Sequence, residues 1–501
     1  MEINRKKASQ WYLSFLYMNF LLNLVKGVFI VPLYLKYMEP RLYGAWLACG
    51  GIIAYLGLCE FGVSRVFIQK VAVCSASSDN KQLTGIVSTG IQLSAALALL
   101  PFLIGLAVSP FVARIVQISG PESIELRNAF ILASIAASLM IFSSTPRGVL
   151  QGMQRQVFVN ICYTGGLLLG ILVTLLLLVR EYGLLAIPIG SLIHAVITAS
   201  GSLVYMVVIL RRQALLEWMR FDRGIFKEIF SSSSFEFGGS VAHTVSAQSD
   251  NLIIAAALSP ELCNVFTFTG MAHKMSSTLG AYIPHATMAG LAHLAGESNP
   301  DRVKKVVADI LKFSAMVGAL LLCVVIFLNE TLVGIWVGSQ YYGGAWLNII
   351  FFAGAVLSMF FLGLNTILSA LGEFRTAGSL VILQGCVQLP LMAGLGYMAG
   401  IPGLALAPVL AMALAIPLQA ITLIRRLNVS QGDLIDALYA LGGVFAVPLA
   451  AVLVIRLFWV PSDVSQLILF CALYGSISVA CYMTIYKSLR DLVAGFVLKR
   501  A

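Results

Sequence analysis

The hexapeptide GLLAIP at residues 183–188 recurs 220 residues later as GLALAP at residues 403–408. At the same offset, LQGMQR (150–155) is matched by ALGEFR (370–375), and PRL (40–42) by PEL (260–262). Each match is weak alone, because Gly and Pro are common residues. Together they fall at equivalent places in the hydropathy pattern. A duplicated set of apolar segments predicts two lobes around a central path, which is typical of transporters.

The composition is that of a membrane protein. The chain has 501 residues, of which 11% are charged and 59% hydrophobic, and its mean hydropathy is +0.93. A soluble protein of this length could not cover its surface with so few charges. The net charge of +10 does not indicate nucleic acid as a partner, because membrane proteins concentrate Lys and Arg on their cytoplasmic side. The partner predicted from composition is the lipid bilayer.

Apolar runs of about 20 residues, each enough to cross a bilayer of roughly 30 Å, occur along the whole chain. We therefore expect an all-α integral membrane protein with about fourteen spans: two pseudo-symmetric lobes of six helices each, followed by two C-terminal helices. The predicted spans are 11–36, 43–69, 85–109, 127–148, 157–179, 183–210, 231–257, 262–293, 308–329, 344–371, 377–399, 402–424, 437–457 and 464–486. The corresponding domains are an N-lobe (1–212), a cytoplasmic linker (213–230), a C-lobe (231–427) and a C-terminal helix pair with its tail (428–501).

The distribution of basic residues predicts the orientation. If the N-terminus is cytoplasmic and the spans alternate, about 23 Lys and Arg fall on the cytoplasmic side and about six on the other. Both termini are then cytoplasmic. The chain contains no G-x-x-x-x-G-K-[ST] motif for nucleotide binding, so transport would draw on an ion gradient, a membrane potential or the substrate gradient. We predict no enzymatic activity, catalytic residue, metal site or cofactor, because the outward loops are short and hold few candidate groups.

Ionisable groups at membrane depth are costly, so each is a candidate functional residue. Four predicted spans carry them on one helix face or toward one end. Span one has Asn19, Asn23 and Lys26; span two has Glu60, Arg65 and Gln69; span seven has Glu236, Ser240, His243 and Asp250; span eight has Thr267, Lys274, Thr278 and His285. At the 220-residue offset, Arg65 corresponds to His285.

These groups allow two interpretations. The basic residues would give the cavity a cationic character suited to an anionic diphosphate headgroup, whereas the acids Glu60, Glu236 and Asp250 would exchange protons or other ions. Alternatively, the charges pair structurally, for example Lys26 with Asp250 or Glu236, and hold the lobes together. Arg147, Arg155 and Arg375 lie at the cytoplasmic ends of spans, where they would admit an anionic headgroup or act as ordinary interfacial anchors.

Several motifs resemble one family of exporters. The stretches VPLYL (31–35), YGAWL (43–47) and YLGLCEFGV (55–63) resemble the start of the Wzx-type O-antigen and capsule flippases. LQG (150–152) and SAQSDNL (246–252) are also similar to that family. These flippases belong to the superfamily of multidrug, oligosaccharidyl-lipid and polysaccharide exporters.

The resemblance implies two six-helix bundles around a central cavity, plus two further helices, in a bacterial or archaeal cytoplasmic (inner) membrane. The implied substrate is a polyprenyl-diphosphate-linked oligosaccharide, an O-antigen, capsule or exopolysaccharide repeat unit, that crosses to the outer leaflet by alternating access. The polysaccharide polymerase and chain-length machinery are the implied partner proteins. Two other functions stay open: a multidrug cation antiporter, which the cationic groups argue against, and a peptidoglycan-precursor flippase.

Overall fold

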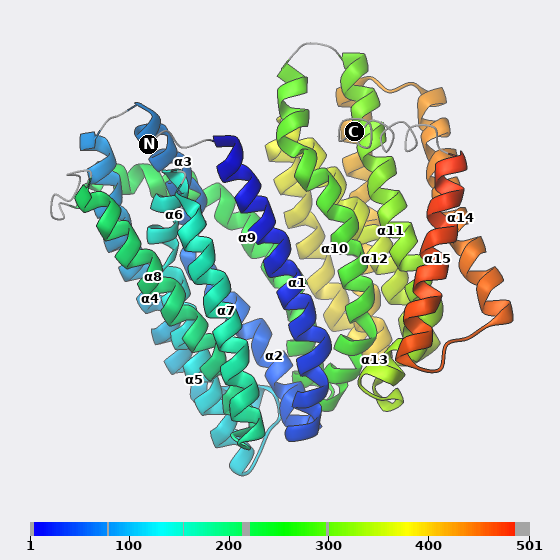
Figure 1. Ribbon diagram of the computed structural model, residues 1–501, viewed down its shortest axis with the longest axis horizontal. Helices are drawn as coiled ribbons and strands as arrows, with labels where there is room; N and C mark the ends of the chain where they lie inside the picture. The colour runs from blue at the N-terminus through cyan, green and yellow to red at the C-terminus, as the bar shows by residue number, and fades with distance from the viewer. Residues whose placement is uncertain (1–4, 78–79, 154, 213–220, 297–299, 486–501) are drawn as a thin grey trace. The chain divides into compact units, whose positions relative to one another are not determined.

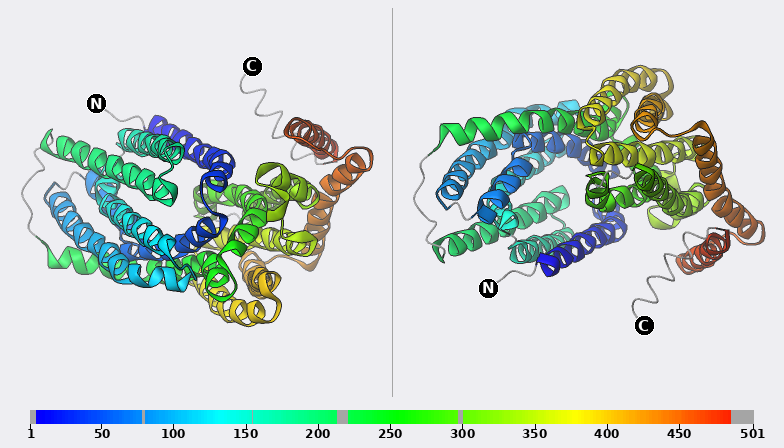
Figure 2. Two further views of the ribbon diagram at one scale, coloured as in Figure 1. Left: turned by 90° about the horizontal axis from the view of Figure 1, so that it is seen from below. Right: turned by 90° about the horizontal axis from the view of Figure 1, so that it is seen from above.

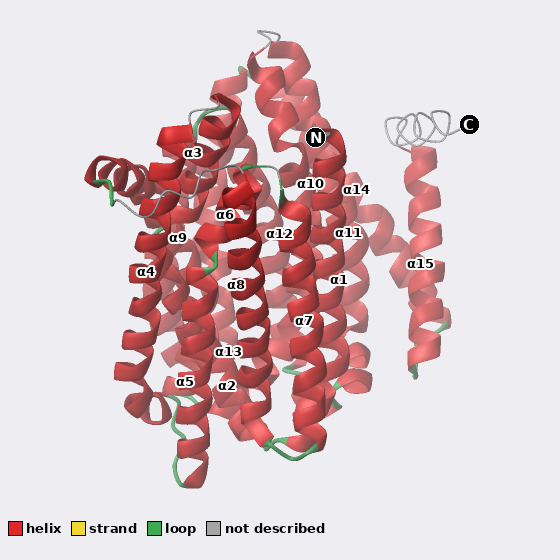
Figure 3. Ribbon diagram, turned by 60° about the vertical axis from the view of Figure 1, so that its left-hand side comes forward, coloured by secondary structure: helices red, strands yellow, loops and turns green. Residues whose placement is uncertain are grey.

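The computed structural model describes residues 1–501 except 1–4, 78–79, 154, 213–220, 297–299 and 486–501 (Figure 1). All regular structure in these residues is helical (Figure 3). Their contacts divide the chain into two compact units, Met1–Asn264 and Val265–Ala501. The prediction of an all-helical membrane protein is confirmed.

The first unit contains nine α-helices and two 3₁₀ turns within its described residues. They are α1 (Arg5–Tyr37), α2 (Pro40–Gly57), η1 (Leu58–Glu60), α3 (Val63–Ser77), α4 (Asn80–Ile115), α5 (Pro121–Phe142), α6 (Ser144–Gly152), α7 (Gln156–Val179), η2 (Gly183–Leu185), α8 (Ala186–Arg212) and α9 (Arg223–Ala257). Views along the helices show α4, α5, α7 and α8 side by side (Figure 2). One core of this unit is apolar, with Phe67, Val149 and Leu150 almost fully buried.

The second unit starts within α10 (Pro260–Gly296) and ends at the C-terminus. It continues with α11 (Pro300–Trp336), η3 (Ser339–Tyr341), α12 (Gly344–Ala370), α13 (Phe374–Leu427), α14 (Gln431–Phe458) and α15 (Val464–Ile485). Two tyrosines of α15 donate hydrogen bonds to carbonyls of neighbouring helices, Tyr474 to Leu320 of α11 at 2.8 Å and Tyr482 to Val444 of α14 at 2.6 Å. The second bond holds the C-terminal helix pair together, and the first joins this pair to α11.

Ten helical segments among the described residues are long and apolar enough to cross a membrane. One of them, α13, holds two predicted spans, because Gly400 has a non-helical backbone (φ 61°, ψ −138°). Helices α1, α9 and α10 have 33, 35 and 37 residues. At 1.5 Å per residue each exceeds the bilayer core of roughly 30 Å, although polar residues make them less apolar than the ten.

Three boundaries differ from the sequence-based prediction. Span two is interrupted at residues 58–62, and span four is divided at Ser143 into α5 and α6. Residues 223–230, which we assigned to the linker, form the first turns of α9. That helix begins there because the Asp222 carboxylate accepts hydrogen bonds from the backbone N–H groups of Gly224 and Ile225. The rest of the predicted linker, apart from residues 221–222, lies outside the described residues.

The repeated motifs mark equivalent element boundaries. Pro40 and Pro260 are the first residues of α2 and α10, where the fixed φ of proline suits the first helical turn. The LQGMQR segment ends α6 before α7, and its counterpart ALGEFR ends α12 before α13. The sequence repeat therefore corresponds to helices that begin and end at equivalent positions.

Candidate functional site in the first unit

The break between α2 and α3 places a carboxylate at the end of a candidate membrane span. After Gly57 the chain forms a single 3₁₀ turn, and Phe61 and Gly62 then adopt positive φ values of 54° and 69°. Such a conformation ends a helix and favours glycine. The Glu60 carboxylate at this break accepts a hydrogen bond from the Ser64 hydroxyl in the first turn of α3. The interruption of span two thus presents Glu60 on a short irregular segment.

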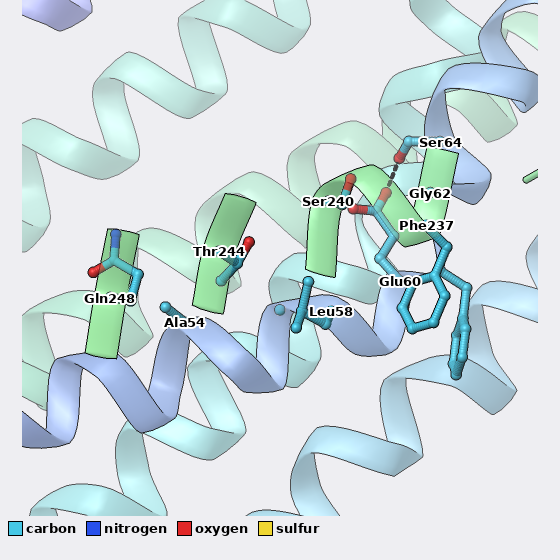
Figure 4. A pocket seen from close by; sticks show the side chains of 11 residues that line it. Ala54, Leu58, Glu60, Gly62, Ser64, Phe237, Ser240, Thr244 and Gln248 are labelled. Carbon is cyan, nitrogen blue, oxygen red and sulfur yellow. Dashed lines mark hydrogen bonds between the residues drawn. The ribbon is translucent and has the colours of Figure 1, made fainter. Parts of the chain in front are cut away.

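A cavity of about 490 Å³ lies between this break and α9 (Figure 4). Helix α9 contributes a polar row, Ser240, Thr244 and Gln248, whose spacing of four residues places them on one helix face. Figure 4 shows these side chains opposite Ala54 of α2 and Leu58 of η1, with Ser240 next to Glu60. The lining residues are Ala54, Gly57, Leu58, Glu60, Phe61, Gly62, Ser64, Phe237, Ser240, Thr244 and Gln248.

Helices α2 and α9 approach each other closely beside this cavity. A Cβ atom added to Gly51 would lie 2.4 Å from the backbone oxygen of Gln248 in α9, and one added to Gly44 would lie 1.9 Å from that of Pro260, the first residue of α10. The absence of a side chain at both positions allows the backbones to meet. The Tyr55 hydroxyl lies 2.6 Å from that of Ser249, which itself donates to the Val245 carbonyl. Tyr55 is therefore the donor in the bond between the two helices.

Removing this bond is expected to destabilise the first unit modestly. Tyr55→Phe should lower the free energy of unfolding by about 1 kcal/mol, because one part-buried neutral hydrogen bond is lost. Ser249→Ala should have a similar effect, and the double variant should lose less than the sum of the two. Thermal unfolding in detergent measures the change. Tyr397→Phe is the control, since the Tyr397 side chain is 94% exposed; an equal loss there would contradict the assignment.

Charged and amide side chains join α2 and α9 toward both ends of this contact. Arg41 lies 3.4 Å from Glu261 and donates to the Gln117 carbonyl at 3.1 Å, while the Gln117 amide donates to the Ala256 carbonyl at 2.7 Å. Lys70 of α3 pairs with Glu228 of α9. These pairs are partly exposed, so each adds little stability alone. They fix the register of the α2–α3 segment along α9.

A second cluster of polar side chains lies on α1 and on the helices packed against it. The Thr164 hydroxyl donates to the Asn19 side-chain oxygen at 2.9 Å, and the Asn23 amide donates to the Asn19 carbonyl at 2.8 Å. Lys26, farther along α1, is half-buried. Lys26 and Arg147 both act electrostatically on the imidazole of His194, whose ring packs edge-on against Tyr163 at 4.7 Å. The cationic side chains of Lys26 on α1 and Arg147 on α6 thus both lie near His194 on α8.

The other predicted site residues are placed as follows. Asp250 is half-buried on α9, close enough to act electrostatically on Tyr55. Arg155 is half-buried just before α7. In the second unit Lys274 and His285 are exposed on α10, and Arg375 is exposed in the first turn of α13. Arg65, Glu236 and His243 lie on α3 and α9, but their side chains are outside the described part of the chain.

Sequence reasoning did not single out most of the cavity. Ser240 and Glu60 were on predicted polar faces, but Ser64, Thr244 and Gln248 were not candidates. The signal for Thr244 and Gln248 was present in the sequence, because they continue the spacing that begins at Ser240. The positive φ of Phe61 had no comparable signal, since this residue type rarely adopts it.

Solved transporters share this architecture. An inward-facing multidrug resistance MATE family transporter of the MOP superfamily matches with a TM-score of 0.66 and 16% identity over 80% of this chain and 94% of its own. The lipid II flippase MurJ in an inward closed conformation matches with a TM-score of 0.61 and 12% identity over 92% of this chain and 100% of its own. The MATE multidrug transporter DinF-BH has a TM-score of 0.59 and 13% identity over 85% of this chain and 96% of its own. The protein thus has the multi-pass helical fold of MOP-superfamily transporters.

The sequence also matches a known protein family. Residues 40–345, more than half of the chain, match the model of a family described as polysaccharide biosynthesis protein, and the chain belongs to that family. No curated protein matches the chain significantly. The resemblance found in the motifs is therefore confirmed at the level of the polysaccharide biosynthesis family, and the fold is that of the superfamily.

Proposed function

We propose that the protein is a flippase that moves a polyprenyl-diphosphate-linked oligosaccharide from the cytoplasmic to the outer leaflet by alternating access. Membership of a polysaccharide biosynthesis family supports a saccharide cargo. The fold supports transport, since it is shared with MATE transporters and with a flippase of lipid II. The cargo would be an O-antigen, capsule or exopolysaccharide repeat unit on its lipid carrier.

The observation that carries this proposal is that two cationic side chains, Lys26 and Arg147, lie near the same imidazole, that of His194, in the first unit. A bilayer-embedded cation is costly unless it meets a counter-charge, and a diphosphate supplies two adjacent anionic groups. Lys and Arg donate charge-assisted hydrogen bonds to phosphate oxygens. Arg155 and Arg375, at the starts of α7 and α13, would attract the headgroup from the cytoplasmic side. In this proposal both termini are cytoplasmic.

We propose residues 1–212 and 231–427 as the two lobes that move in alternating access, with Lys274 and His285, exposed on α10, as further basic contacts for the headgroup. Energy would come from an ion gradient, with Asp250 or Glu236 as the carboxyl group that exchanges the ion. The protein would act beside the polymerase and chain-length machinery in the inner membrane.

Removing the protein from its own cells tests the proposed cargo. We expect loss of the surface polysaccharide and accumulation of its lipid-linked repeat unit in the membrane, measured by mass spectrometry of extracted lipids. Sensitivity to cationic dyes should not change. Dye sensitivity with normal surface polysaccharide would contradict the proposal in favour of a multidrug antiporter, and accumulation of peptidoglycan precursor would indicate a lipid II flippase.

A further inference from the structure

We infer that the cavity between α9 and the α2–α3 break is a carbohydrate-binding subsite that holds part of the cargo's sugar. The inference rests on the proposed function and assigns the residues that would bind the sugar of the cargo. Its volume of about 490 Å³ falls in the range of about 300–1,000 Å³ that is usual for small-molecule sites. Every described lining residue belongs to the first unit, so the cavity is considered within one compact body.

The hydrogen-bonding groups suit a ligand with many hydroxyls. The Glu60 carboxylate accepts hydrogen bonds, the hydroxyls of Ser240 and Thr244 donate and accept, and the Gln248 amide does both. From Ser240 to Gln248 the row extends roughly 12 Å along the helix, at 1.5 Å per residue. Sugar hydroxyls are spaced around a ring and are both donors and acceptors. The row of Ser240, Thr244 and Gln248 can both donate and accept hydrogen bonds, and the Glu60 carboxylate lies at the Ser240 end, so the lining matches that pattern (Figure 4).

The remaining walls suit the less polar faces of a sugar. Ala54 and Leu58 lie opposite the polar row. Phe61 and Phe237 both line the cavity, and their ring centroids are 4.7 Å apart. Aromatic rings give a large apolar surface on which the C–H face of a pyranose can pack. The cavity therefore combines apolar contact with directional hydrogen bonds, as ligand sites generally do.

The lining argues against two simpler roles for Glu60. A cation site would gather several anionic or carbonyl oxygens at one point, but among the described residues of the lining Glu60 is the only charged one, and its neutral partners extend along α9. An exchanging proton needs no extended row of hydroxyl and amide groups. We therefore assign Glu60 to binding of the sugar and leave ion exchange to the acids of α9.

Two variants change the cavity in different ways. Gly57 lines it in a helical conformation, and a Cβ added there meets no atom within 4 Å, so Gly57→Leu fills the cavity without backbone strain. Glu60→Gln keeps the shape and removes the charge. Gly50→Leu is the matched control, because Gly50 is an exposed residue of the same helix, equally open and outside the lining.

Native mass spectrometry of the full-length protein in detergent would measure binding of two lipids. One is the polyprenyl-diphosphate oligosaccharide extracted from the cells that make the protein, and the other is undecaprenyl diphosphate without sugar. We expect Glu60→Gln to weaken binding of the first lipid about tenfold or more, as for loss of one charge-assisted hydrogen bond. Gly57→Leu should weaken it as well, because the leucine side chain occupies the space of the sugar. Binding of the second lipid and the thermal unfolding temperature should stay at the wild-type values, and Gly50→Leu should bind both lipids normally.

Unchanged binding of the oligosaccharide lipid by both variants would overturn the inference. Equal weakening of both lipids would also overturn it, because the cavity would then serve the diphosphate or the fold. Competition by a cationic dye that Glu60→Gln abolishes would make it a cation site instead. Wild-type protein that binds neither lipid would contradict the proposed function itself, whereas wild-type binding without any variant effect contradicts the subsite alone.

Discussion

Alanine at Gly51 is expected to destabilise the protein strongly, whereas alanine at the neighbouring Gly50 is expected to be harmless. A Cβ at Gly51 would lie 2.4 Å from the Gln248 backbone oxygen, and one at Gly50 meets no atom within 4 Å. A backbone atom cannot swing aside as a long side chain can, so α2 and α9 must separate. Overpacking of this kind costs about 1–3 kcal/mol or more. Gly50→Ala should instead gain up to about 1 kcal/mol from helix propensity.

Thermal unfolding of the two variants in detergent, compared with wild type, measures this difference. Gly44→Ala provides a second instance, because its Cβ would meet the Pro260 backbone oxygen at 1.9 Å. Transport by Gly51→Ala should fall as well, since Gln248 belongs to both the contact and the cavity. Equal stability of Gly50→Ala and Gly51→Ala would show that the two helices are not in close contact at this point.

Lys26→Ala is expected to slow translocation of the lipid-linked oligosaccharide about 10- to 100-fold. A charge-assisted hydrogen bond contributes about 1.5–3 kcal/mol, and every 1.4 kcal/mol is about a tenfold change. Lys26→Arg should keep most of the rate, because a guanidinium also binds a diphosphate. The measurement is the initial rate of lipid movement in proteoliposomes, corrected for the amount of folded protein.

Lys36→Ala is the matched control for this experiment. Lys36 lies in the last turn of the same helix, is exposed, and its ammonium lies 5.5 Å from the centre of the Tyr37 ring. We expect the control to transport at the wild-type rate. An equal loss in both variants would indicate a general effect of charge on α1, and an unchanged rate for Lys26→Ala would remove this lysine from the substrate path.

The sequence predicts the parts of the fold that depend on short-range patterns along the chain. Apolar runs identified the spans, and Pro40 and Pro260 marked helix starts at equivalent positions of the repeat. The break at residues 58–62 could not be predicted, because Cys59 and Phe61 continue the apolar run and only the backbone conformation ends the helix. Likewise, no local pattern places α9, predicted as the first span of the second lobe, within the compact unit that ends at Asn264.

The candidate site shows the same limit. Glu60 and Ser240 were each found because a polar residue inside a membrane span is exceptional. Their juxtaposition depends on the pairing of α2 with α9, which are far apart in the sequence, and on the small residue Gly51 that permits it. Single-sequence patterns contain periodicity but not such long-range pairing. For the same reason the grouping of His194 with Lys26 and Arg147 emerged only from the structure.

The most direct test of the central claim is translocation by purified protein in proteoliposomes. The vesicles would carry polyprenyl-diphosphate oligosaccharide, with and without a proton gradient of either direction, and a cationic dye would be the control cargo. We predict protein-dependent movement of the oligosaccharide lipid that responds to the gradient and is strongly slowed in Lys26→Ala, without movement of the dye. Movement of the dye without movement of the lipid would contradict the account and would make the protein a cation exporter.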